Sequence, residues 1–126
     1  MVTNYPVGDF LIRIKNAAMA GRKTVSAPVV KEILAISQSL KKLGFLEKVE
    51  KSGNSLKVSI AFKNKKPRLL NLKLVSKPGL RIYLGVKDLE KKKGPSVFLL
   101  STPKGIISSK EALKQRVGGE VIAEVI

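Results

Sequence analysis

The chain has 126 residues, of which 44% are hydrophobic, enough for one domain or for two small lobes that share a core. Its 25 Lys and Arg residues against 9 Asp and Glu residues give a net charge of +16, and it contains neither Cys nor His. This composition excludes disulfides, thiolate or imidazole metal sites and the commonest general base, and it favours a polyanionic partner such as nucleic acid. Residues 1–20 lack the charge and apolar pattern of a secretion signal, and no apolar run is long enough to cross a membrane, so we expect a cytoplasmic protein with no membrane contact.

Two helices are predicted in the first half of the chain. Residues 9–20 carry apolar side chains at helical spacing, with Pro6 near the start and Gly21 at the end. Residues 29–43 repeat this pattern and are followed by Gly44, and the segment "KTVSAPV" between the helices is predicted to be extended. Each apolar stripe is interpreted as part of the core, because a small domain needs its apolar faces inside.

The pattern then changes to the alternation of strands. "FLEKVEK" and "LKVSIAF" alternate on either side of "SGNS", which predicts a β-hairpin. The polar segment "KNKKPR" follows and indicates a boundary. We therefore predict an N-terminal α+β lobe over residues 1–63, a bridge over 64–67 and a C-terminal lobe over 68–126.

A second hairpin is predicted from "LLNLKLV" and "LRIYLG". The turn "SKPG" lies between them, and Pro78 followed by Gly79 fits a type II turn. Proline sets one dihedral angle of such a turn, and glycine accepts the positive one.

The rest of the chain is predicted to be mostly β. "KDLEKKKGP" is interpreted as a turn or brief helix and "SVFLL" as a buried strand. Ser108 and Glu111 have the spacing of a capping box, which predicts a helix from residue 109 to about 116. "VGGEVIAEVI" supplies a glycine pair and a final strand, so the fold class is α+β.

Catalytic chemistry has little support in this sequence. Ser101 and Ser108 would need a neighbouring base to act as nucleophiles, and neither lies in an S-x-x-K or G-x-S-x-G motif. No glycine-rich phosphate loop occurs, and we expect no metal and no cofactor. Gly118 and Gly119 are open to two interpretations: a close approach of the backbone to a strand or ligand, or a tight turn after a helix.

The middle of the chain is rich in basic residues and poor in acidic ones. Between residues 63 and 93 only Asp88 and Glu90 oppose them, which favours a broad positive surface that holds phosphates. Tyr83 is the one aromatic residue expected to face outward there, so we predict recognition of a folded RNA by shape rather than by base stacking. The basic residues of this region are Lys63, Lys65, Lys66, Arg68, Lys73, Lys77, Arg81, Lys87, Lys91, Lys92 and Lys93.

The segment "LLSTPKGIISSKE" follows the buried strand and is rich in groups that form hydrogen bonds. Ser101 and Thr102 can donate and accept at once, which suits the edges and 2′-hydroxyls of an RNA groove. Pro103 limits the entropy lost on ordering, Lys104 can contact a phosphate, and Gly105 permits a tight turn. On these residues alone, a loop that reads RNA and a loop that only joins a strand to a helix remain equally open.

Four blocks of the sequence together resemble the family of the eighth protein of the small ribosomal subunit, in its bacterial form. They are "VGDFLIRIKNAAMAG", "SKPGLRIYLG", "LLSTPKGIISSKEA" and "VGGEV", and the match runs from end to end. Pro103 stands where that family usually has a third hydroxyl, and the chain ends in "AEVI" rather than in the usual aromatic ending.

The resemblance implies a two-lobed α+β protein that binds the central domain of small-subunit ribosomal RNA and supports subunit assembly. It implies contacts with neighbouring small-subunit proteins, the fifth and the twelfth, and we expect a monomer when the protein is free. It also assigns most RNA contact to the C-terminal lobe, through Ser101, Thr102, Pro103, Lys104, Gly105, Gly118, Gly119 and Glu120 with Tyr83 nearby, to which the basic run adds Lys65 and Lys66.

We therefore expect a structural protein of the ribosome, not an enzyme. Two alternatives are kept: a general basic RNA- or DNA-binding module outside the ribosome, and an enzyme that uses Ser101.

Overall fold

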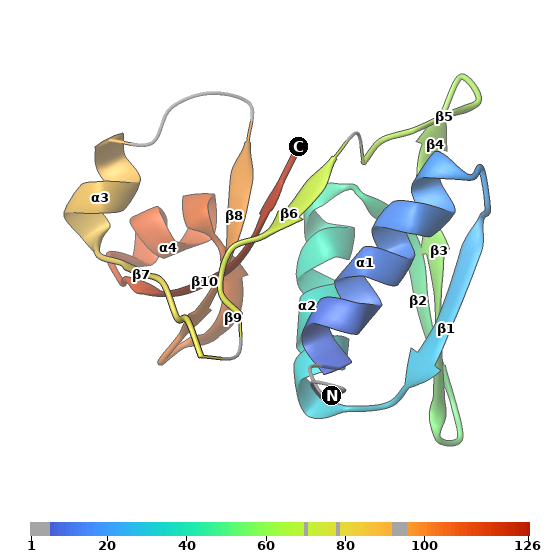
Figure 1. The fold of residues 1–126 in the computed structure, drawn as a ribbon, viewed down its shortest axis with the longest axis horizontal. Coiled ribbons are helices and arrows are strands. Elements are labelled where there is room, and N and C mark those ends of the chain that lie inside the picture. The colour runs from blue at the N-terminus through green and yellow to red at the C-terminus, as the bar shows by residue number, and fades with distance from the viewer. Residues whose placement is uncertain (1–5, 70, 78, 92–95) are drawn as a thin grey trace.

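The computed structural model describes residues 6–69, 71–77, 79–91 and 96–126. In the first half of the chain, two helices lie against one face of a three-stranded sheet with the order β1-β3-β2 (Figure 1). These elements are α1 (Pro6–Met19), β1 (Thr24–Pro28), α2 (Lys31–Leu43), β2 (Leu46–Ser52) and β3 (Ser55–Ile60).

Both predicted N-terminal helices are confirmed, with shifted starts. Helix α1 begins at Pro6, where the missing N–H of proline costs nothing. Helix α2 begins two residues later than predicted, because Val30 is extended and acts as its N-cap, and it ends at Gly44 in the left-handed region with φ of +89°.

The predicted hairpin of β2 and β3 is also confirmed. Ser52 pairs with Ser55 at the turn and Val49 pairs with Val58. Leu56, Val58 and Ile60 alternate along β3 and are buried, as the period of two requires.

The polar segment after β3 folds back on itself. The strands β4 (Phe62–Lys63) and β5 (Lys66–Pro67) form a two-stranded hairpin, and Asn64 and Lys65 at its turn have φ of 54° and 67°. Positive φ at both central residues is the geometry of a type I′ turn. The division of the chain into two lobes at 64–67 stays a prediction.

The second half of the chain forms a five-stranded sheet in which β10 (Gly119–Val125) is central. Its path is β6-β10-β8-β9, and β7 also pairs with β10. The other strands are β6 (Leu72–Leu74), β7 (Tyr83–Leu84), β8 (Val97–Thr102) and β9 (Gly105–Ser108).

The predicted turn of the second hairpin is present, since Lys77 and Leu80 exchange backbone hydrogen bonds, but β6 and β7 do not pair with each other in the described residues. β6 pairs with residues 123–125 of β10 and β7 pairs with residues 119–120, so the two segments lie one after the other along β10. Lys77 and Leu80 form the only bridge seen between them in the described residues, and Gly79 has φ of +85°. Pro78 lies outside the described residues. Strand β10 contributes Val121, Ile122, Ala123 and Val125 to the core, so pairing with it places both segments against the buried part of the sheet.

Two short helices cover the second sheet. Helix α3 (Val86–Lys91) matches the predicted brief helix, except that residues 92–95 lie outside the described part. Helix α4 (Ser109–Gln115) matches the predicted capped helix, because the Ser108 hydroxyl accepts a hydrogen bond from the Glu111 N–H at 3.2 Å.

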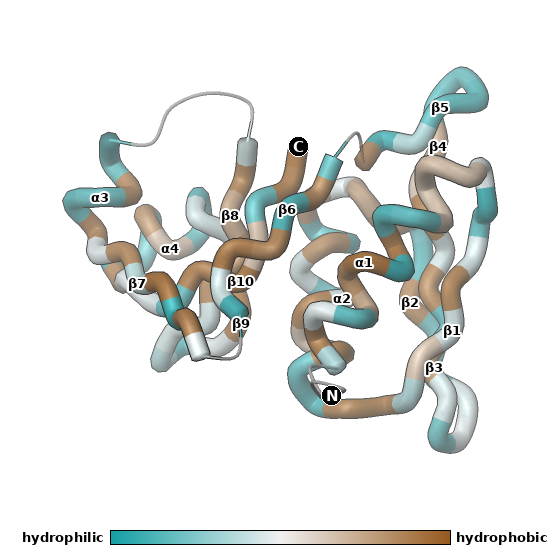
Figure 2. The backbone as a smooth tube through the Cα atoms, in the orientation of Figure 1, coloured by the Kyte–Doolittle hydropathy of each residue, from teal (hydrophilic) through white to brown (hydrophobic). Residues whose placement is uncertain are grey.

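The core continues across both halves of the molecule. Leu72, Leu99 and Val125 pack in one cluster with the buried faces of α1 and α2, whereas Leu100 and Val121 pack with α3 and α4. Neighbouring residues of β8 therefore point to opposite sides of the sheet. Figure 2 shows the apolar residues along β10 that contribute to both clusters. No helix in the described ranges is long and apolar enough to span a membrane.

Candidate nucleic-acid interface

The segment "STPKG" forms the tip of the hairpin between β8 and β9. Thr102 pairs with Gly105, and Pro103 and Lys104 make the two-residue turn. Proline suits the second position of such a turn, and Gly105 closes it with φ of +107°, a conformation that other residues rarely adopt. The segment therefore does not join a strand directly to a helix, because strand β9 intervenes.

The hydroxyl of Thr102 stabilises this turn. It donates a hydrogen bond to the Gly105 carbonyl oxygen at 2.8 Å and accepts one from the Lys104 N–H at 3.1 Å. Ser101 and Lys104 are exposed. The two hydroxyls that the sequence places side by side therefore differ: Thr102 shapes the tip, and Ser101 is presented to solvent.

Three predicted site residues form a row across neighbouring strands. Ser101 of β8 lies opposite Glu120 of β10, and Glu120 lies opposite Tyr83 of β7. Residues that are paired in this way point to the same face of a sheet. Tyr83 is 67% exposed, so its ring is available to a partner. The sheet thus brings together side chains from three separate segments, and we call Ser101, Glu120 and Tyr83 the surface row.

The glycine pair allows neighbouring backbones to approach closely. A Cβ atom on Gly119 would collide with the carbonyl oxygen of Ser101, and one on Gly118 would lie 2.8 Å from the Cα atom of Gly85. Of the two interpretations open at the sequence level, the structure supports a close approach to neighbouring strands.

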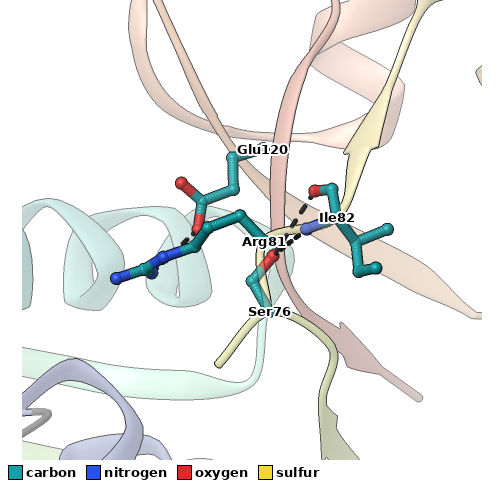
Figure 3. A network of polar contacts seen from close by, with 4 residues as sticks. All are labelled: Ser76, Arg81, Ile82 and Glu120. Carbon is teal, nitrogen blue, oxygen red and sulfur yellow. Dashed lines mark hydrogen bonds and ion pairs between the residues drawn. The ribbon is translucent and has the colours of Figure 1, made fainter. Parts of the chain in front are cut away.

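Glu120 has a charged partner that the sequence prediction did not identify. Arg81 Nη1 lies 3.1 Å from Glu120 Oε2 (Figure 3), so the carboxylate of the surface row is balanced by a guanidinium. The alternation of "LRIY" was a usable signal, because Arg81 lies two residues before Tyr83 and shares its face.

A buried serine holds the segment that carries Arg81. The Ser76 hydroxyl accepts a hydrogen bond from the Ile82 N–H at 2.9 Å, and the Ile82 carbonyl oxygen accepts one from the Val121 N–H at 2.8 Å. Ser76 is fully buried, and Figure 3 shows its hydroxyl directed at the backbone of Ile82. Ser76 thus holds the residue before β7, and the Val121 N–H joins the same residue to β10 next to the surface row.

Lys65 and Lys66 lie elsewhere. They belong to the β4–β5 hairpin, which is at the opposite end of the molecule from the tip of β8 and β9 (Figure 1). The structure therefore brings together the hairpin tip, the glycine pair, Glu120 and Tyr83, but not these two lysines. Lys92 and Lys93 lie outside the described residues.

Comparison with known proteins gives one consistent result. Residues 5–126 match the family model described as Ribosomal protein S8. Proteins named small ribosomal subunit protein uS8 are 41% identical in Roseiflexus castenholzii and 42% identical in Chloroflexus aggregans, each over 99% of both chains. The protein of that name in Ruegeria pomeroyi is 39% identical over 97% of this chain and 98% of its own length. The chain therefore belongs to the ribosomal protein S8 family: it is a structural constituent of the small subunit of the cytoplasmic ribosome, and not an enzyme.

Proposed function

We propose that the protein binds the central domain of small-subunit ribosomal RNA through the surface row and the tip of the β8–β9 hairpin, and that it supports subunit assembly in this way. The observation that carries this proposal is the register Ser101–Glu120–Tyr83, which collects polar and aromatic side chains on one face of the sheet. Three of the four blocks that resemble the ribosomal family, "SKPGLRIYLG", "LLSTPKGIISSKEA" and "VGGEV", supply residues of this surface.

Each residue has a separate part in the proposed contact. The Ser101 hydroxyl donates to and accepts from 2′-hydroxyls and base edges of a shallow RNA groove, and Lys104 contacts a phosphate. Tyr83 contributes an aromatic face with a hydroxyl at its end. Thr102, Pro103 and Gly105 give the tip its shape, while Gly118 and Gly119 keep β10 close to its neighbours.

Glu120 accepts hydrogen bonds from RNA donors such as exocyclic amines. A bare carboxylate would repel phosphates, but its ion pair with Arg81 offsets that charge. Lys65 and Lys66 lie on a separate hairpin and contribute an attraction to phosphates that does not depend on sequence.

In this proposal the two lobes of the protein have different roles. Residues 68–126 form the RNA-binding lobe, and residues 1–63 form a supporting lobe that contacts the fifth and twelfth proteins of the subunit. The free protein is a monomer. The shared core supports a fixed arrangement of the two halves, because Leu72 and Val125 pack against the N-terminal helices.

The proposal is tested by hydroxyl-radical footprinting of the full chain on small-subunit ribosomal RNA. We expect protection confined to the central domain, and its loss in a Ser101→Ala, Lys104→Ala double variant that retains the wild-type circular dichroism spectrum. A Ser26→Ala variant is the control, because Ser26 is an exposed strand serine of the other sheet. Equal protection of all RNA domains would instead indicate a general basic RNA-binding module.

A further inference from the structure

Among the described residues, a side-chain hydrogen bond joins the β8–β9 hairpin to the N-terminal half of the molecule, beside the packing of Ile106 against the core. Ser39 of α2 donates from its hydroxyl to the Ile106 carbonyl oxygen of β9 at 2.8 Å. Strand β9 is the outermost strand of its sheet, so no described strand pairs with its outer edge, and α2 lies beside it. The hydroxyl thus satisfies an acceptor that the sheet leaves open.

This hydrogen bond is made by the residue that neighbours the surface row on the adjacent strand. Ile106 pairs with Ser101 across the β8–β9 ladder, and Ser101 in turn pairs with Glu120. A displacement of Ile106 therefore moves Ser101 and the tip together. Ser39 lies on a segment far from the motifs of the predicted site, and sequence analysis did not identify it.

The surroundings of Ser39 determine the cost of losing its hydrogen bond to Ile106. Ser39 is only 9% exposed, and it lines a cleft of about 600 Å³ between α2 and the β9–α4 segment, together with Leu43 and Ile106. Ile106 is half-buried and packs against the core, and a partly buried carbonyl that loses its hydrogen-bond donor incurs a desolvation cost that an exposed carbonyl avoids.

We propose that Ser39 is a positioning residue for RNA binding: its hydrogen bond to Ile106 fixes the β8–β9 hairpin against α2 and so presents Ser101 and the tip in the orientation that binds RNA. This inference rests on the proposed function. It assigns to the N-terminal half a part in RNA recognition that requires no contact with RNA.

The chain offers a matched control in the same helix. Ser37 is fully buried on α2 as well, but its hydroxyl donates to the Ile33 carbonyl oxygen of its own helix at 2.8 Å. Ser39→Ala and Ser37→Ala therefore each remove one buried serine hydroxyl from α2, and only the first affects the hairpin. Ser39→Thr retains the hydroxyl and is the rescue variant.

The experiment measures the affinity of these full-length variants for a transcript of the central domain of small-subunit ribosomal RNA. Ser39→Ala is expected to weaken binding about fivefold, with an unchanged salt dependence. Ser37→Ala and Ser39→Thr are expected to bind as the wild type does. Wild-type affinity in Ser39→Ala, or an equal loss in Ser37→Ala, would overturn the proposal.

Hydrogen exchange in the free protein tests the same point without RNA. The Lys104 amide, which is bonded to the Thr102 hydroxyl, is expected to exchange faster in Ser39→Ala than in the wild type, but not in Ser37→Ala. If the wild type fails to bind the transcript, the proposed function is wrong, whereas unchanged exchange in Ser39→Ala shows that the positioning role is wrong. Thermal unfolding of each variant identifies the temperature at which all of them are folded.

Discussion

Gly119 lies so close to Ser101 that no side chain fits between them. A Cβ atom on Gly119 would collide with the Ser101 carbonyl oxygen and would lie 3.0 Å from Thr102 Cγ2. Two residues of the proposed RNA surface are thus held at a separation that only glycine permits. The glycine pair acts on the site through the backbone, and not through a contact of its own.

Gly119→Ala is expected to lower the free energy of unfolding by about 1–3 kcal/mol, because β8 and β10 must separate to admit the methyl group. Urea unfolding measures the loss. The control is Gly85→Ala, whose Cβ atom would lie 3.8 Å from Asp88 Oδ2, an ordinary contact, so that its cost should stay below about 1 kcal/mol. Equal losses in both variants would contradict the close approach as the cause.

RNA binding is expected to depend strongly on salt, because each neutralised phosphate releases condensed counterions. If about 5 phosphates are neutralised, the logarithm of the affinity falls against the logarithm of the salt concentration with a slope of roughly −3.5 to −4.5. Filter binding across a series of salt concentrations measures this slope. A slope near zero would be incompatible with a phosphate-contacting surface.

Ser101→Ala is expected to weaken binding to the central-domain RNA by about 1–3 kcal/mol, since the RNA group that the hydroxyl meets is left unpaired. The salt slope and the unfolding temperature should both stay unchanged, because the hydroxyl is uncharged and exposed. Thr102→Ala, in contrast, should lower the unfolding temperature, because the Thr102 hydroxyl closes the turn. The interpretation of Ser101 fails if a folded variant binds cognate RNA normally, or if it loses unrelated RNA to the same extent.

Replacement of Lys65 and Lys66 by Ala is expected to affect RNA binding in the opposite way to Ser101→Ala. The loss of affinity should be mild and similar for cognate and unrelated RNA, and the salt slope should become shallower by about one unit for each true phosphate contact. Both side chains are exposed on the β4–β5 hairpin, so stability should be unaffected. An unchanged slope would show that these lysines do not contact phosphates.

Arg81→Ala is expected to weaken RNA binding more than the loss of one cation explains, because it also leaves the Glu120 carboxylate unbalanced among phosphates. Adding Glu120→Gln to this variant should restore part of the affinity, whereas Glu120→Gln alone should weaken it. The coupling energy from the four proteins of this double-mutant cycle is expected to be about 1 kcal/mol. Additive effects would mean that the ion pair does not serve the interface.

The sequence by itself determined the local elements of this protein. The helices α1, α2 and α4 follow from apolar spacing and from end signals such as Gly44 and Ser108, and the β2–β3 hairpin follows from alternation around a short turn. These signals suffice because the partners of each hydrogen bond lie within a few residues. The sequence motifs also pointed to the hairpin tip and the glycine pair as candidate site residues. They did so through a resemblance to a family, and the comparisons confirm that family.

Only the tertiary structure decided which strands pair in the second half and what surrounds the site. Strand β10 takes both β6 and β7 as partners, one after the other, although the local turn between them forms at Lys77 and Leu80. The surface row, the ion pair of Arg81 with Glu120 and the hydrogen bond of Ser39 to Ile106 each join segments far apart in the chain. Short-range patterns can place a residue on a face, as the alternation of "LRIY" does for Arg81, but they do not give its partner, because these contacts form only when the sheet and α2 have packed around the common core.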